Sequence, residues 1–238
     1  MKINRPIIAL DFNDRQIVFD FLEKFPKDEK LYVKIGMELY YSEGNRLVEE
    51  VLDQGHDVFL DLKCHDIPHT VEKAMFVLGK TGVSLTTTHA SGGSEMLKKA
   101  QFGLVEGALQ AGKKEPKLLA ITQLTSTDEK MVKDEQLSAV GLTKSVENYA
   151  TLAKNAGLAG VVCSGHEANK IKTLLGDDFL RVTPGIRLES DSVGDQKRVM
   201  TPDLAAKNGS SAIVVGRSIT QAADPLKAYN KIKELWNQ

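Results

Sequence analysis

The sequence contains very little cysteine, with only Cys64 and Cys163 among its 238 residues. These two positions match no metal-ligand spacing, so the sequence offers no cysteine-based metal centre. A chain of this size without a secretory signal is more plausibly a cytosolic protein than a disulfide-stabilised one. We therefore expect both cysteines to be free thiols.

The sequence also lacks an excess of either charge, with 31 Lys and Arg against 32 Asp and Glu, a formal net charge of −1. This balance provides no electrostatic basis for binding nucleic acid or an anionic membrane surface. The apolar run in MKINRPIIALDF is too short for a signal peptide, and no other stretch approaches the length of a membrane span. We expect a cytoplasmic protein with no nucleic-acid or membrane partner.

What the sequence does contain is a regular succession of short apolar runs and helical patterns. A content of 42% apolar residues is sufficient for a large core. Strands are expected where the runs are short, apolar and bounded by turn residues. Those runs are 7–12, 31–36, 58–62, 84–89, 117–124, 160–163, 179–183 and 212–215.

Helical spacing of apolar residues separates these runs. Helices are expected over 14–25, 46–54, about 71–78, 94–110, the end of the segment that reaches 155, a short stretch to 175, and from Pro225 onward. The first helix should bury Ile17, Val18, Phe21, Leu22 and Phe25, and the last should bury Leu226, Tyr229, Ile232 and Leu235.

Eight strand–helix units in 238 residues average about 30 residues each, the usual length of a βα repeat. No linker or composition shift divides the chain, and the strands are apolar throughout, as when both faces of a sheet are covered. The prediction is an α/β protein, a single (β/α)8 TIM-barrel domain over residues 1–238. The alternative is a doubly wound open sheet, but no GxGxxG motif follows the first strand.

The stretch 57–70, DVFLDLKCHDIPHT, combines a buried strand with charged residues. Because alternate side chains of a strand share a face, Phe59, Asp61 and Lys63 should point one way and the apolar residues between them the other. Pro68 suits the first turn of a helix, so the charges lie where a strand ends and a loop begins. In parallel α/β folds, chemistry is concentrated at that place.

Charged residues also end the first two strands, at Asp11 and Lys34. On a barrel these strands neighbour the third, so Asp11, Lys34, Asp61 and Lys63 should meet at the catalytic face. A structural salt-bridge network is the alternative to a catalytic site. However, desolvation can outweigh the attraction between buried charges, which makes them poor stabilisers.

The last two strands are followed by residues suited to an anion. Gly216 and Arg217 follow the eighth strand, where barrels often bind phosphate. The seventh is followed by PGIR at 184–187 and a long polar loop, LESDSVGDQKR. That loop can be read as a lid over a substrate or as a solvent loop. His65, His69 and His89 lie near the predicted mouth without metal-binding spacing, which favours capping or hydrogen bonding.

Together these segments resemble the orotidine 5′-phosphate decarboxylase family. DLKCHDIPHT at 61–70 is similar to its DxKxxDIxxT signature. The other matching motifs, in the family's order and across nearly the whole chain, are ALDF at 9–12, KIG at 34–36, QLTS at 123–126, PGIR at 184–187, GDQKR at 194–198 and VGRSI at 215–219.

The resemblance implies a role for each matched residue. The implied catalytic residues are Lys63, Asp61, Asp66 and Lys34. Of these, Lys63 would protonate C6 of the pyrimidine. The implied substrate-binding residues are Asp11, Lys34, Asp61, Lys63, Asp66, Ile67, Thr70, Thr125, Pro184, Arg187, Gln196, Gly216 and Arg217. Of these, Asp66, Ile67 and Thr70 would reach the site of the other subunit of a homodimer. Gln196, Gly216 and Arg217 would hold the 5′-phosphate.

The resemblance further implies orotidine 5′-phosphate as substrate, with no cofactor and no bound metal. Two alternatives are a magnesium-dependent phosphosugar decarboxylase or aldolase of the same suprafamily and a catalytically silent nucleotide-binding barrel. Lys34 argues against the first, because it places a cation where a metal site would need an acid. Retention of the four residues implied in catalysis, Lys34, Asp61, Lys63 and Asp66, argues against the second.

Overall fold

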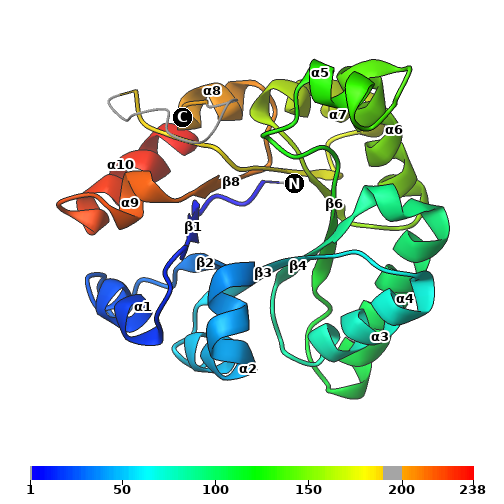
Figure 1. Cartoon of the computed structure of the whole chain (residues 1–238). Helices are drawn as coiled ribbons and strands as arrows, with labels where there is room; N and C mark the ends of the chain where they lie inside the picture. Colours follow the sequence, from blue (N-terminus) through cyan, green and yellow to red (C-terminus); the bar gives the residue numbers. More distant parts are fainter. Residues whose placement is uncertain (1, 190–199) are drawn as a thin grey trace.

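The computed structural model describes residues 2–189 and 200–238. In that part of the chain, strands and helices alternate, and each strand pairs in parallel with the next. The last strand pairs with the first, which closes the barrel (Figure 1). The predicted (β/α)8 barrel is thereby confirmed. Its strands are β1 (Ile7–Ala9), β2 (Tyr32–Gly36), β3 (Asp57–Cys64), β4 (Leu85–His89), β5 (Lys117–Ile121), β6 (Gly160–Val162), β7 (Leu180–Thr183) and β8 (Ala212–Val215).

Helices surround the strands (Figure 1). They are α1 (Arg15–Leu22), α2 (Met37–Asp53), α3 (Pro68–Gly79), α4 (Gly93–Gln110), α5 (Glu129–Asp134), α6 (Gly141–Asn155), α7 (Gly165–Leu175), α8 (Pro202–Lys207), α9 (Arg217–Thr220) and α10 (Pro225–Trp236), with a short 3₁₀ turn, η1 (Ala90–Gly92). None of these helices has both the length and the apolar character needed to cross a membrane.

Two apolar layers hold the barrel together, because each strand is covered on both faces. Val58 and Leu60 of β3 pack outward with the helices, whereas Phe59 points into the barrel. The predicted division of β3 into two faces is therefore confirmed. The interior layer consists of Ile7, Ala9, Tyr32, Phe59, Leu85, Leu119, Leu180, Val182, Ala212 and Val214.

Several predicted boundaries were wrong. The first strand ends at Ala9 rather than at residue 12, and the fifth at Ile121 rather than at 124. Helix α2 begins at Met37 rather than at residue 46. Its interior contains a kink at Gly44, with φ 68° and ψ −162°, which interrupts the helical spacing that the sequence pattern depended on.

Two predicted buried faces also need correction. Ile17 of α1 is 45% exposed, although Val18, Phe21 and Leu22 are buried as expected. On α10 the fully buried residue near the end is Trp236, whereas Leu235 is only half-buried. In both cases an apolar residue one position away lies nearer the core, a difference that 3.6-residue periodicity alone cannot resolve.

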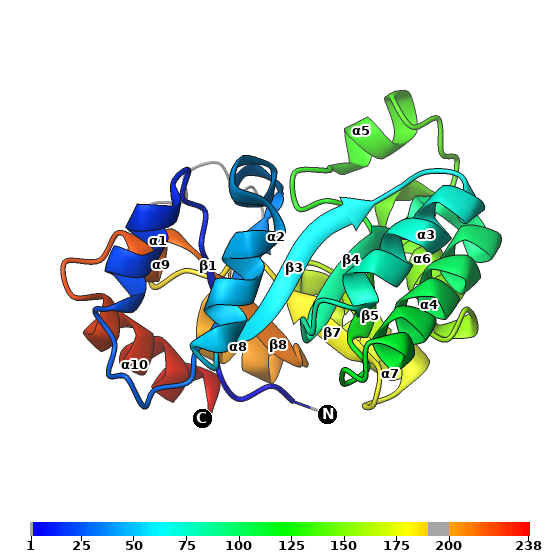
Figure 2. The same ribbon diagram turned by 90° about the horizontal axis from the view of Figure 1, so that it is seen from below.

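The two ends of the chain are held against each other. The Trp236 indole N–H donates to the Ile3 carbonyl at 2.8 Å, and the Asn237 amide donates to the Asn4 carbonyl at 2.9 Å. The Lys2 ammonium lies 4.2 Å from the Trp236 ring centroid. Both termini lie at the end of the barrel opposite α5 (Figure 2).

Helices α3 and α4 run side by side in both views of the molecule (Figures 1 and 2). Glycines allow their backbones to approach closely. A Cβ at Gly107 would lie 2.0 Å from the Phe76 carbonyl oxygen, and one at Gly103 would lie 2.2 Å from the Glu72 carbonyl oxygen. Real Cβ atoms do not approach backbone oxygens so closely, so these positions require glycine.

Gly107→Ala should therefore destabilise the protein by about 1–3 kcal/mol, because forced separation of the helices outweighs the better helix propensity of Ala. Urea unfolding would measure the change. Lys98→Ala, at an exposed position of the same helix, is the matched control and should have little effect. A Gly107→Ala protein as stable as the control would show that the helices can separate without cost.

Candidate active site

The end of β3 departs from regular strand geometry. Its register with β4 runs from Leu60↔Thr86 to Cys64↔Thr88, so two extra residues lie on β3 between those pairs. Within this irregularity Lys63 has φ 52°, a left-handed conformation that is uncommon for a non-glycine residue. Such bulges redirect side chains and are frequent next to active sites. Here the irregularity coincides with the charged end of the strand.

The structure brings together the four charged residues that end β1, β2 and β3. The Lys63 Nζ lies 2.8 Å from Asp61 Oδ2, and the Lys34 Nζ lies 4.0 Å from the same oxygen. The Lys34 Nζ also donates to Asp11 Oδ1 at 3.0 Å. We call Asp11, Lys34, Asp61 and Lys63 the charged quartet. Its signs alternate along the row, so each carboxylate faces an ammonium.

Burial differs along the charged quartet. Asp61, inside the row, is 7% exposed, whereas Asp11, at one end of it, is open to solvent. A buried carboxylate is costly unless cations and hydrogen-bond donors compensate it. Asp61 has both, because Lys63 binds one oxygen and the Thr87 hydroxyl donates to the other at 2.9 Å.

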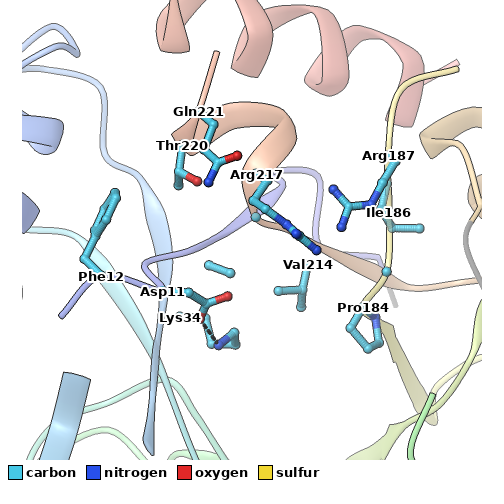
Figure 3. A pocket seen from close by; sticks show the side chains of 13 residues that line it. Asp11, Phe12, Lys34, Pro184, Ile186, Arg187, Val214, Arg217, Thr220 and Gln221 are labelled. Atoms are coloured by element: carbon cyan, nitrogen blue, oxygen red, sulfur yellow. Dashed lines mark hydrogen bonds and ion pairs between the residues drawn. The ribbon is translucent and has the colours of Figure 1, made fainter. Parts of the chain in front are cut away.

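Two cavities open on the quartet. The larger, about 460 Å³, is lined by Asp11, Lys34 and, on its far side, by Arg187 and Arg217. Figure 3 shows the two guanidinium groups pointing toward each other across the opening, and the ion pair of Asp11 and Lys34 below them. This cavity therefore has a cationic end suited to a phosphate.

The smaller cavity, about 200 Å³, is lined by Lys34, Asp61, Lys63 and Thr125 and by apolar side chains of the barrel interior. Lys34, Pro184 and Val214 line both cavities, so the two adjoin. Together they place the two arginines at one end and the charged quartet, with apolar side chains of the barrel interior, at the other.

Other predicted site residues lie elsewhere. Asp66, Ile67 and Thr70 line neither cavity and are exposed on the chain surface at the start of α3, with Ile67 66% exposed. Asp66 Oδ1 accepts from the Ile67 backbone N–H at 2.6 Å. Gln196 and the predicted closing loop around it lie outside the described residues.

The base of that loop is described. The Arg187 N–H donates to the Met200 carbonyl at 3.1 Å, and the Met200 N–H donates to the Gly185 carbonyl at 3.3 Å. Gly185 has φ +77°, a conformation that glycine adopts readily. These contacts hold Arg187 next to the end of β7, beside the larger cavity.

Sequence reasoning missed several residues around the site. Phe12, Thr220 and Gln221 line the larger cavity. Gln123 lines the smaller one and forms reciprocal amide hydrogen bonds with Gln136, at 2.9 and 3.1 Å. Gln123 is the first residue of the QLTS motif, and that position is the sequence signal that points to it.

The histidines and cysteines have local roles in the described structure. The His65 and His89 rings lie with their centroids 5.6 Å apart and their planes tilted by 34°. Burial lowers the pKa of His89, and the neighbouring His65 and Lys63 lower it further. Burial raises the pKa of the Cys64 thiol. Within residues 2–189 and 200–238, no three His, Cys, Asp or Glu side chains form a group able to hold a metal ion.

The chain is similar to known proteins over nearly its whole length. The model of the "Orotidine 5′-phosphate decarboxylase / HUMPS family" matches residues 4–232. The chain belongs to this family. It is 61% identical over 238 residues to the orotidine 5′-phosphate decarboxylase of Ligilactobacillus salivarius, with all of both chains covered. It is 54% identical over 235 residues to that of Enterococcus faecalis, with 99% of both chains covered.

Solved structures of family members show the same fold. The crystal structure of orotidine 5′-phosphate decarboxylase from Lactobacillus acidophilus has a TM-score of 0.89 and 43% sequence identity, and the match covers 98% of this chain and 99% of that one. The resemblance inferred from DLKCHDIPHT and the accompanying motifs is thus confirmed at the level of the family.

Proposed function

We propose that this chain is an orotidine 5′-phosphate decarboxylase, which converts orotidine 5′-phosphate to uridine 5′-monophosphate and CO2 in pyrimidine biosynthesis. The observation that carries the proposal is the charged quartet, which places two ammonium groups around one buried carboxylate beside a cavity with an arginine-lined end. Family membership and full-length relatives of that name support it.

The chemistry requires an ammonium close to C6 of the pyrimidine. Loss of CO2 breaks the bond from C6 to the carboxyl carbon and leaves the electron pair in the ring plane, where no π-system delocalises it. Lys63, 2.8 Å from Asp61, is the proposed stabilising cation and proton donor. A proton from its Nζ neutralises C6, and solvent restores the proton to Lys63.

Asp61 is proposed to lie beside the substrate carboxylate that leaves. Lys34 and Lys63 hold Asp61 in that place. Because its two oxygens are engaged by Thr87 and Lys63, Asp61 cannot turn away from a second negative charge. Repulsion between two carboxylates would be relieved only as the C–C bond breaks, which favours the transition state over the bound substrate.

The remaining cavity residues are proposed to bind the rest of the nucleotide. Asp11 and Lys34 would contact the ribose hydroxyls, and Thr125 the pyrimidine. Pro184 and Arg187 lie at the base of the proposed closing loop. Gln196, Gly216 and Arg217 would hold the 5′-phosphate. Since the phosphate is remote from the bond that breaks, its binding energy can close the loop and expel water.

The protein is further proposed to be a cytoplasmic homodimer whose single-domain subunits share their sites. Exposure of Asp66, Ile67 and Thr70 supports this arrangement, because these family-signature residues line neither of the two cavities of their own chain. A second subunit would bring its Asp66 to this site and complete the charge network.

The purified protein should decarboxylate orotidine 5′-phosphate at an undiminished rate after treatment with a chelator. The reason is that an ammonium, rather than a metal, is proposed to stabilise the carbanion. The fall in ultraviolet absorbance on conversion to product measures the rate. Activity lost with the chelator and restored by magnesium would favour the phosphosugar type of chemistry, and no activity at all would favour a silent nucleotide-binding barrel.

Arg217→Ala should lower kcat/KM by a factor equivalent to about 2–3 kcal/mol of transition-state stabilisation. The reason is that a charge-assisted contact to phosphate is lost and loop closure is weakened. The penalty should largely vanish for orotidine, which lacks the phosphate. Arg46→Ala, which removes an exposed arginine on α2, is the control and should leave both rates unchanged. An equal penalty on both substrates would show that Arg217 acts elsewhere.

Lys63→Ala and Asp66→Ala homodimers should each be nearly inactive, yet their mixture should recover activity. In a mixed dimer both defects fall in one site, and the other site is intact. Random exchange makes half the dimers mixed, so activity should reach roughly a quarter of wild type. The measurement is the decarboxylation rate after the two variants are refolded together, with mixed-dimer formation checked separately.

The matched control mixes Lys63→Ala with Asp61→Ala. These two residues are proposed to serve the same subunit's site, so each site of their mixed dimer carries one defect and activity should not recover. If Lys63→Ala with Asp66→Ala also fails to recover although mixed dimers form, Asp66 does not cross the interface.

A further inference from the structure

Three consecutive threonines of β4 direct their hydroxyl groups at β3, and all three are fully buried. Thr86 Oγ1 donates to the Leu60 carbonyl at 2.9 Å, and Thr88 Oγ1 donates to the Cys64 carbonyl at 2.7 Å. Thr87 is the exception, because its hydroxyl binds Asp61 and Lys63 of the charged quartet.

The direction of the two Thr87 hydrogen bonds is determined by their partners. The Lys63 backbone N–H can only donate, and it donates to Thr87 Oγ1 at 2.9 Å. The hydroxyl hydrogen is then available for Asp61 Oδ1, 2.9 Å away. Asp61 Oδ2 is left to Lys63 Nζ at 2.8 Å. One hydroxyl thus fixes which oxygen of Asp61 faces the lysine.

The same hydroxyl binds the backbone at the irregular point of β3. Lys63 has φ 52°, and a non-glycine residue keeps such a conformation only when its surroundings enforce it. The Lys63 N–H lies where the register between β3 and β4 shifts, and it donates to the Thr87 side chain. Thr87 therefore restrains both the backbone of Lys63 and the carboxylate that binds its Nζ.

We propose that Thr87 is a positioning residue for decarboxylation, which aligns Asp61 and Lys63 through its single hydroxyl group. This inference rests on the proposed function of the same site. Thr87 does not line either cavity, so its effect on the reaction is exerted through the two residues that do.

The test is Thr87→Val, which keeps the branched shape and removes the hydroxyl. The kcat should fall by about 10- to 100-fold, since small misplacements of catalytic groups have effects of this size. Affinity for uridine 5′-monophosphate, which lacks the leaving carboxylate, should change little.

Two further variants make the comparison specific. Thr87→Ser retains the hydroxyl and should recover most of the activity. Thr86→Val is the matched control, because it removes a buried hydroxyl bound to β3 from the neighbouring position, and it should lower the melting temperature without a comparable fall in kcat. If Thr87→Val does not fold, the same measurements are made on Thr87→Ala, which also lacks the hydroxyl.

The proposal is overturned if Thr87→Val lowers kcat no more than Thr86→Val, if Thr87→Ser is as impaired as Thr87→Val, or if product affinity falls in parallel with kcat. These outcomes all require an active wild-type protein. An inactive wild type would instead contradict the proposed function, so the two failures are distinguishable.

Discussion

A carboxylate inside an apolar barrel must be compensated by cations and donors, and the architecture of this site follows from that requirement. Asp61 is 7% exposed and meets Lys63, Lys34 and a threonine hydroxyl from three successive strands. Each compensating group is needed because an uncompensated buried charge costs several kcal/mol. The same contacts hold the carboxylate in one orientation. The groups that neutralise the charge of Asp61 therefore also position it.

The closed barrel is what brings these groups together. Residues that end neighbouring parallel strands project from the same rim, so β1, β2 and β3 deliver alternating charges to one place. Across the rim, Arg187 and Arg217 follow β7 and β8 and form the cationic end of the larger cavity. Arg217 begins α9, two residues beyond β8, whereas Arg187 lies four residues beyond β7.

Much of this arrangement could be predicted from the sequence, because apolar runs locate strands and charges at their ends locate the rim. What could not be predicted depends on pairing in three dimensions. The kink at Gly44 and the left-handed conformation of Lys63 are backbone features that apolar periodicity does not encode, and the second lies at a register shift. Strand alternation separates Thr87 from Thr86 and Thr88, but which residues of β3 it meets depends on the register between the two strands.

The joining of the two chain ends has a consequence for how the protein is made. Closure of the barrel requires β8 to pair with β1, and Trp236 then bonds to Ile3. The β8 segment and α10 are synthesised after the other seven strands, so the first strand waits for its partner until β8 has left the ribosome. The larger cavity contains Asp11 from the beginning of the chain and Arg217 from near its end. A nascent chain can therefore form much of the scaffold, but the larger cavity is complete only after the segment that contains Arg217 has been synthesised.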